Sequence, residues 1–318
     1  MEAGLIMFKK LFGKKESKNQ SSLNEPINKN SSTQKGKNEL DSIKTYVSKG
    51  DYISAINMAD SYISTVEKPG YNAEEKKLKY YFANYEEFIV FIEVNSALIE
   101  EKKTEIENLI FLSGYASDIL QMKAYALFEM KRHQEAADVL YYAISEFNPI
   151  GVNLRFELIE NYFKLNQLDL AEKELKTLGE FVMSSKDIAK LYRRLGFCKI
   201  EQGNHVEARI CLQYSLIFEK SEKAIHEIAY IDNIIAEPWN EENFKEKIDW
   251  LLSGMGMGMC SALANEMNLS FIPTQFQIAS GFSLLKMYDE TNNSQKKEEL
   301  HSLLSIWQET IEALKETE

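Results

Sequence analysis

The chain has 318 residues, of which 44% are hydrophobic and 27% charged, with only 14 Gly and 5 Pro. This composition allows a continuous buried core and offers few helix breakers, so we expect an all-α protein. The net charge of −12 is unevenly distributed, because residues 1–38 carry +5 (8 Lys and 3 Glu) and the rest therefore carries −17. An acidic body repels phosphate groups, which argues against sequence-independent binding of nucleic acid.

Residues 1–38 form a basic tail that is rich in Ser, Asn, Gln and Lys. Such a segment buries too little apolar surface to order itself, so we expect it to be flexible. Its first residues have two interpretations, either a solvated tail or weak contact with an anionic membrane surface, to which each Lys contributes about 1 kcal/mol. The residues that would make this contact are Phe8, Lys9, Lys10, Leu11, Phe12, Lys14 and Lys15. The apolar run is too short for a secretory signal.

The helical part is expected to begin at residue 39, and residues 39–66 predict a turn followed by a helix around Ala55. Asp51 suits the N-cap of that helix. For residues 73–113 we predict a long, irregular pair of helices, because apolar residues recur at intervals of three and four and no strand-like alternation is evident. The longest helix of the chain is expected here, with an apolar face made of Leu78, Phe82, Tyr85, Ile89 and Ile92.

Residues 120–143 predict two amphipathic helices joined by a tight polar turn, with small residues at fixed places. The arrangement recurs downstream, since Ala136, Ala171 and Ala208 are equivalent and are separated by 35 and 37 residues. Two antiparallel helices about 8 to 10 Å apart leave no room for a large side chain where they cross, so Ala and Gly mark the contact. A lone hairpin cannot bury its apolar face, and several hairpins must therefore stack.

This pattern resembles the tetratricopeptide repeat over residues 116–236 and, more loosely, over residues 39–66. The resemblance implies a right-handed superhelix of stacked helical hairpins, an α-solenoid, that spans residues 39–237. Three features depart from the family pattern: no Trp opens a unit, Ile159 stands where Gly or Ala is usual, and the later units lack a closing Pro. Residues 238–318 are expected to form C-terminal helices that cap the solenoid. The helices expected there are 241–267, 273–291, with Pro273 in the first turn, and 294–315.

The resemblance also implies that the first helices of successive hairpins line a concave groove that binds a protein or a peptide. The repeat register places ten residues on this groove, many of them aromatic: Gln121, Tyr125, Phe128, Asn153, Phe156, Glu160, Phe163, Lys190, Arg193 and Phe197. The rings would pack against the partner, and the Lys and Arg would bind a carboxylate. The alternative is that the rings face neighbouring helices. The paired Lys and Asn with which some family members clamp chaperone tails are not at the matching places.

Gly alternates with Met over residues 254–259, which indicates a flexible or strained piece rather than a helix-dimerisation face. The methionines have two interpretations: they form an adaptable apolar surface for a partner, or they fill the core, which we favour. The broad apolar face of the last helix is expected to pack on the solenoid. A partner helix or a second copy of the chain could use that face instead, which would make a homo-oligomer.

Catalytic motifs are absent from the sequence, which contains no HExxH, GxxxxGK[ST] or GxSxG pattern. Cys198, Cys211 and Cys260 lack the spacing of a zinc site or a disulfide framework and are typical of a cytoplasmic protein, so we expect no metal and no cofactor. His133 and His205 each lie three residues before an equivalent Ala, which indicates a structural role.

These observations favour a non-catalytic cytoplasmic scaffold or adaptor that binds a protein or a peptide. Two alternatives stay open. One is a regulator that responds to a peptide, as in families whose repeats close around a short signalling peptide. The other is an enzyme with a site in the C-terminal segment, around Cys260 and His301.

Overall fold

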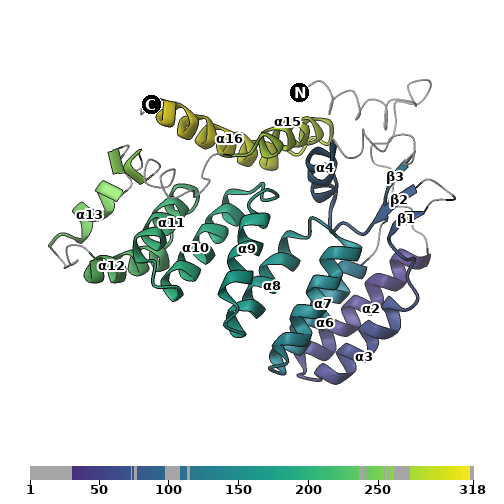
Figure 1. Cartoon of the computed structure of the whole chain (residues 1–318). Helices are drawn as coiled ribbons and strands as arrows, with labels where there is room; N and C mark the ends of the chain where they lie inside the picture. Colours follow the sequence, from purple (N-terminus) through teal and green to yellow (C-terminus); the bar gives the residue numbers. More distant parts are fainter. Residues whose placement is uncertain are drawn as a thin grey trace. The chain divides into compact units, whose positions relative to one another are not determined.

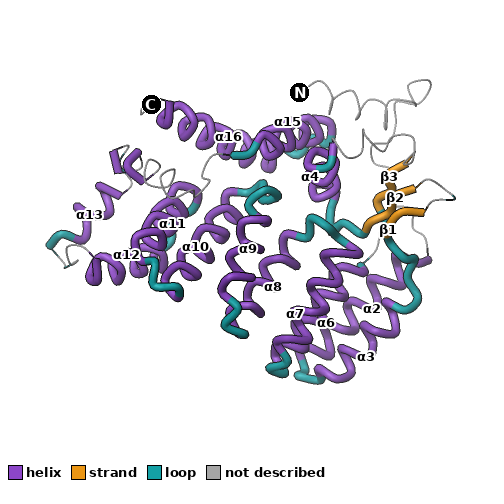
Figure 2. The backbone as a smooth tube through the Cα atoms, in the orientation of Figure 1, coloured by secondary structure: helices purple, strands orange, loops and turns teal. Residues whose placement is uncertain are grey.

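The computed structural model describes residues 31–72, 74, 77–96, 108–112, 115–235, 240, 242–251, 253, 255–256, 258–260 and 273–315. Most of these residues are helical, as expected, and three short strands form a small sheet (Figures 1 and 2). The chain divides into two compact units, an N-terminal unit (Met1–Gln167) and a C-terminal unit (Leu168–Glu318). Each unit is described by itself.

Helical hairpins make up most of the N-terminal unit (Figure 1). Its helices are α2 (Ser31–Ser48), α3 (Tyr52–Ile63), α4 (Tyr85–Val94), α6 (Ala116–Glu129), α7 (His133–Tyr142) with the π-helical turn η2 (Ala143–Phe147), and α8 (Val152–Lys164). Each hairpin helix packs on the next one, and α2 and α8 also both contact α6. The first described helix, α2, begins at Ser31, so part of the predicted tail is helical.

The hairpins pack as the sequence predicts. Ala55 and Ala136 are fully buried in the second helices of their hairpins, where α3 packs on α2 and α7 packs on α6. The turn before α3 ends at Asp51, whose carboxylate accepts a hydrogen bond from the backbone N–H of Ser54 at 3.1 Å. This confirms the predicted N-cap, which satisfies a backbone donor that the first helical turn leaves without a partner.

A three-stranded sheet interrupts the hairpins (Figure 2). Its strands are β1 (Gly70–Asn72), β2 (Lys77–Tyr80) and β3 (Asn108–Phe111), with β1 antiparallel to β2 and β2 parallel to β3. Helix α4 lies between β2 and β3 in the chain, as a parallel pair requires a crossover connection. The predicted helical pair over residues 73–113 is therefore wrong.

The predicted longest helix, with its face from Leu78 to Ile92, is wrong for the same reason. Leu78 lies in β2, and α4 begins only at Tyr85, after Asn84 caps the helix by accepting a hydrogen bond from the Glu87 N–H at 2.9 Å. Strands of three or four residues are too short to show alternation, so helical spacing in the sequence was coincidental. The longest described helix is α16, with 22 residues.

The sheet is fastened to the second hairpin. The Tyr81 N–H donates to the Phe147 carbonyl at 2.8 Å, and the Ser117 hydroxyl donates to the Tyr81 carbonyl at 2.6 Å. The Tyr81 side chain is buried in the same core cluster as Leu120 and Leu140 of the hairpin. Because α3 packs directly on α6, the wide spacing between the alanines of the first two hairpins reflects an inserted module that contains β1, β2, α4 and β3.

Helices joined by short turns and loops make up the described part of the C-terminal unit (Figure 1). Its helices are α9 (Leu168–Leu178), α10 (Ser185–Glu201), α11 (His205–Phe218), α12 (Glu222–Ile235), α13 (Phe244–Leu251), α15 (Gln275–Glu290) and α16 (Ser294–Lys315). Successive contacts join α9 to α10, α10 to α11, and α11 to α12, and α15 packs on α16. The division between units falls after Gln167, whereas the sequence suggested a boundary near residue 237.

Helices α10 and α11 cross closely at Gly196. A Cβ atom added to Gly196 would lie 2.8 Å from Cγ of Leu212, which is itself fully buried. Ala171 and Ala208 are also fully buried. The predicted role of small residues at helix contacts is therefore confirmed here as well.

The C-terminal helices were predicted with small errors. Helix α16 has the predicted bounds, while α15 begins two residues later than expected, because Thr274 and Gln277 form a capping box after Pro273. The helix predicted from residue 241 is α13, followed by helical residues at 255–256 and 258–260. Gly254, Met257 and residues 261–267 lie outside the described residues. None of the described helices combines the length and the apolar composition needed to cross a bilayer.

Candidate functional site

The ten predicted groove residues fall into two sets that belong to different units. Helices α6 and α8 of the N-terminal unit carry seven of them: Gln121, Tyr125, Phe128, Asn153, Phe156, Glu160 and Phe163. Helix α10 of the C-terminal unit carries Lys190, Arg193 and Phe197. The seven-residue set lies on two helices that contact each other.

Tyr125 is the most informative of the N-terminal set. Its side chain is 42% exposed on α6, and Asn153 is exposed on the adjacent helix α8. Gln121, Glu160 and Phe163 are partly exposed. Solvent therefore reaches a polar and aromatic surface on these two helices, as the repeat register predicts.

Phe156 is a correction to the predicted groove. It is 1% exposed and belongs to the core, because α8 packs on both α6 and α7 and so buries more than one face. Phe128 is partly buried as well, and its ring packs edge-on against the ring of His133 with centroids 4.8 Å apart. This contact supports the structural role expected for that histidine, which is the first residue of α7. For these two rings the alternative interpretation, packing against neighbouring elements, is the better one.

The charge around Tyr125 is negative. The pKa of its phenol is raised mainly by the negative charge of Glu129, one helical turn further along α6, and also by partial burial and a hydrogen bond with that carboxylate. Glu157 of α8 and Tyr52 of α3 raise the pKa further. Side chains on three helices thus act on one exposed phenol: two carboxylates and one further tyrosine.

The three residues on α10 all have interactions within the chain. Arg193 forms an ion pair with Glu219 of the same unit at 2.9 Å, and Lys190 and Phe197 each have a partner as well. The sequence had suggested that Arg193 is available to a partner's carboxylate. In the structure, the Glu219 carboxylate of the chain itself binds Arg193 instead.

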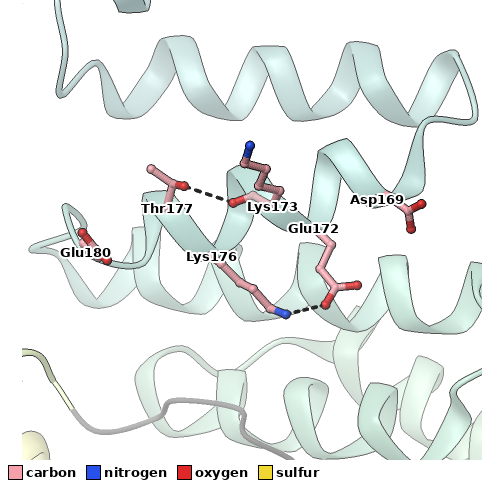
Figure 3. Close-up of a pocket in the computed structure, with 6 residues that line it drawn as sticks. All are labelled: Asp169, Glu172, Lys173, Lys176, Thr177 and Glu180. Carbon is pink, nitrogen blue, oxygen red and sulfur yellow. Dashed lines mark hydrogen bonds and ion pairs between the residues drawn. The ribbon is translucent and has the colours of Figure 1, made fainter.

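A buried charge network, which the sequence did not reveal, joins α9, α10 and α11. The Lys199 ammonium lies 3.0 Å from the Glu172 carboxylate and 2.8 Å from that of Glu207, and its side chain is only 9% exposed. Glu172 also accepts a hydrogen bond from Lys176 at 2.7 Å (Figure 3). It accepts another from Gln202 at 2.9 Å. Burial alone would raise the pKa of Glu172, but these donors outweigh it and lower the pKa to about 2.

A shallow hollow of about 470 Å³ runs along the same helix (Figure 3). Its lining comes from one face of α9 and from Glu180 just after that helix: Asp169, Glu172, Lys173, Lys176, Thr177 and Glu180. Glu172 and Lys176 bind each other, and the Thr177 hydroxyl donates to the Lys173 carbonyl at 3.1 Å. The lining combines three carboxylates with two ammonium groups, and it contains no nucleophile paired with a base.

A second buried polar cluster holds the inserted sheet module to α8. The Glu87 carboxylate accepts hydrogen bonds from the Ala83 N–H at 2.9 Å, the Asn148 amide at 2.8 Å and the Val152 N–H at 3.3 Å. Glu87 is 8% exposed, and burial raises its pKa because none of these donors is charged. The cluster orients the start of α8, which carries the exposed Asn153.

The residues proposed for an enzymatic alternative do not form an accessible site. Cys260 is 2% exposed, its Sγ contacts the Ile210 carbonyl at 3.4 Å, and burial raises its pKa to about 12, whereas His301 is exposed on α16. Burial raises the pKa of Cys198 and of Cys211 as well. A buried thiol with a raised pKa is a poor nucleophile. Among the described residues, no group of three or more His, Cys, Asp or Glu side chains is arranged to hold a metal ion.

Two further expectations concern the basic N-terminal segment and the methionines of residues 254–259. The possible membrane-contact residues, Phe8 to Lys15, lie outside the described residues. Met255 and Met259 are 73% and 52% exposed, so the favoured interpretation of the methionines as core residues is wrong for these two. The intervening Gly256 accepts a hydrogen bond at its carbonyl from Gln213 at 3.0 Å, which fastens this segment to α11.

Comparison of the chain with protein-family models and with curated proteins gives no match.

Proposed function

We propose that the chain is a non-catalytic scaffold or adaptor, a tetratricopeptide-like α-solenoid that binds a protein or a peptide on the face formed by α6 and α8. Its hairpins would stack into a right-handed superhelix, and α15 and α16 would cap one end. The fully buried alanines at equivalent places support this arrangement, as does the packing of each hairpin helix on the next from α2 to α8 and, in the other unit, from α9 to α12.

The exposure of Tyr125 is the observation that carries the proposal. A tyrosine that is 42% exposed presents a rigid ring and a hydroxyl to solvent, and such residues supply much of the contact energy of protein interfaces. Asn153, exposed on α8, adds an amide that can bind a peptide backbone. The polar cluster around Glu87 holds the start of α8 in place, so this amide is presented by a rigid element.

The proposal is tested by selecting peptides from a displayed library of random 12-residue sequences on the intact, immobilised chain. We expect enrichment of related sequences, and we expect Tyr125→Ala to bind the selected peptides about tenfold more weakly. Tyr141→Ala is the matched control, because this tyrosine is 63% exposed on α7, the other helix of the same hairpin. Phe156 is left unchanged, since removal of a core ring would unfold the unit.

Two results would reject the proposal. One is the absence of any enriched sequence. The other is unchanged affinity of the selected peptides for Tyr125→Ala, which would assign binding to another surface.

A further inference from the structure

The helical turn after α13, with its described residues 255–256 and 258–260, lies with one side against α11. The Gly256 carbonyl accepts a hydrogen bond from the Gln213 amide of α11 at 3.0 Å, and the Cys260 thiol contacts a carbonyl of α11 at 3.4 Å. Gly256 and Cys260 are both buried, and they stand four residues apart, which is about one turn of a helix. These two small residues therefore form the inner side of the turn.

The outer side of this turn carries two methionines. Met255 and Met259 are 73% and 52% exposed, and each directly precedes one of the two inner residues, so both lie on one face. Residues four apart on a helix have Cβ atoms about 5 to 6 Å from each other, and the flexible Met side chain can bring both sulfur atoms to one point. Gly258 lies on the same face, and a Cβ atom added to it would have no described atom within 4 Å, its chain neighbours aside. The space beside the two sulfur atoms is therefore open.

Oxygen atoms of this turn serve its own structure. The Ser253 hydroxyl donates to the Trp250 carbonyl at 2.7 Å and accepts a hydrogen bond from the Gly256 N–H at 3.1 Å. A hard cation such as Mg²⁺ or Ca²⁺ needs several oxygen ligands, and the described residues contain no group of three or more His, Cys, Asp or Glu that could hold a metal ion. Thioether sulfur is instead a soft, neutral ligand that selects Cu(I).

We propose that Met255 and Met259 bind Cu(I) between their two sulfur atoms, on a turn that the hydrogen bond from Gln213 holds against α11. This site goes beyond the proposed peptide binding and belongs to the C-terminal unit. The sequence led us to expect no metal because of the spacing of the cysteines, an argument that does not concern thioethers. Binding by thioethers releases no proton, whereas a thiolate or imidazole site must first lose one, so the affinity of this site should not depend on pH.

The first test is an anaerobic titration of the intact chain with Cu(I) in competition with bicinchoninate, whose coloured copper complex is followed by absorbance. We expect the natural chain to withdraw the ion from this complex, and the double variant Met255→Leu with Met259→Leu to bind it about tenfold more weakly. Leucine keeps the size and the apolar character of each side chain, so the fold should be retained. Met130→Leu, which changes a partly exposed Met at the end of α6, is the control and should bind as the natural chain does.

The second test needs no variant to bind or to fail. The natural chain is labelled with ¹³C at the methyl groups of its 11 methionines, and Cu(I) is added under anaerobic conditions while the methyl signals are followed by NMR. The signals of Met255 and Met259, assigned from the single Leu variants, should shift, because their methyl carbons are bonded to the sulfur atoms that hold the ion. Repetition of the titration at pH 6 and at pH 8 should give the same affinity.

Three results would overturn the proposal. One is equal affinity of the natural chain and the double variant, and another is the absence of a shift of the Met255 and Met259 methyl signals on addition of Cu(I). The third is an affinity that rises from pH 6 to pH 8, which would assign the ion to a deprotonated thiol. Folding of each variant is checked by circular dichroism. Peptide binding on α6 and α8 would stand in each case, since it concerns the other unit.

Discussion

Glu87 in the N-terminal unit and Glu172 in the C-terminal unit are both largely withdrawn from solvent, yet their pKa values move in opposite directions. At Glu87 the donors are two backbone N–H groups and an amide, which leave the buried negative charge uncompensated, so burial dominates and the pKa rises. At Glu172 two ammonium groups and an amide overcome the same penalty.

The difference shows two ways of joining helices with a buried carboxylate. The N-terminal unit uses neutral donors to orient the start of α8, whereas the C-terminal unit uses opposite charges to hold α9, α10 and α11 together. Neutral donors tolerate a change in the charge of the carboxylate. Opposite charges do not, because removal of one partner leaves another charge buried and unpaired.

Of the changes considered, replacement of Lys199 should lower the free energy of unfolding the most. Lys199→Met leaves Glu172 and Glu207 without their shared cation, and we expect a loss of about 3 kcal/mol in the free energy of unfolding of the C-terminal unit. Urea unfolding followed by tryptophan fluorescence measures it, since all three Trp of the chain lie after residue 168. Lys176→Met is the control, because that side chain is 58% exposed and should contribute less than about 1 kcal/mol. Equal losses for the two variants would show that the network is not a buried one.

Exchanging Gly and Ala at equivalent positions of the α10–α11 and α6–α7 hairpins should change the free energy of unfolding by an intermediate amount. Gly196 of α10 is equivalent to Ala124 of α6, and Gly196→Ala forces a methyl group against Leu212, with an expected loss of about 1.5 kcal/mol after the gain in helix propensity is subtracted. Ala124→Gly should cost about 1 kcal/mol for the opposite reason, a more flexible helix. Thermal unfolding followed by circular dichroism checks both. A stabilised Gly196→Ala variant would mean that α10 and α11 lie further apart than described.

Lowering the pH should change the free energy of unfolding the least. Protonation of Glu172 should destabilise the C-terminal unit, whereas protonation of Glu87 should stabilise the N-terminal unit. The pKa of Glu172 is lowered to about 2, so its contribution is complete above its ordinary value of 4.5 and is lost as pH falls from 4.5 towards 2, by about 1 kcal/mol. The pKa of Glu87 is raised, so the folded state binds the proton more tightly and acidification through this range favours folding.

The measurement compares the natural chain with Glu172→Gln and with Glu87→Gln from pH 7 to pH 3. As pH falls, the free energy of unfolding of the natural chain should approach that of Glu172→Gln. Over the same range, the natural chain should become more stable relative to Glu87→Gln. Parallel curves for the two variants would contradict the opposite pKa shifts.

The hairpins could be predicted from the sequence because a physical constraint fixes residue size at each helix crossing. The same constraint explains why Ala136, Ala208 and Gly196 recur in register, and broad apolar periodicity defines α16. The sheet could not be predicted, because each strand is only three or four residues long and its neighbours are set by pairing between distant segments. A local pattern contains no information about such pairing.

The candidate surface was predicted only in part. Tyr125 and Asn153 are exposed as the register requires, because the solvent face of a repeat helix follows from its periodicity. The burial of Phe156 and the pairing of Arg193 with Glu219 depend on how many neighbours each helix has, which one helix cannot reveal. The partners of Lys199 are 27 residues before it and eight residues after it, on two other helices, so their meeting is a property of the fold.

The direct packing of α3 on α6 has a consequence for how this chain can change. The backbone departs after Ile63, builds β1, β2, α4 and β3, and rejoins at Ala116, while the two helices on either side stay in contact as if adjacent in sequence. Closing a longer excursion costs only about 0.6 kcal/mol for each doubling of its length. A foreign domain could therefore be inserted, or new surface acquired, between α3 and α6 without disturbing the hairpins on both sides.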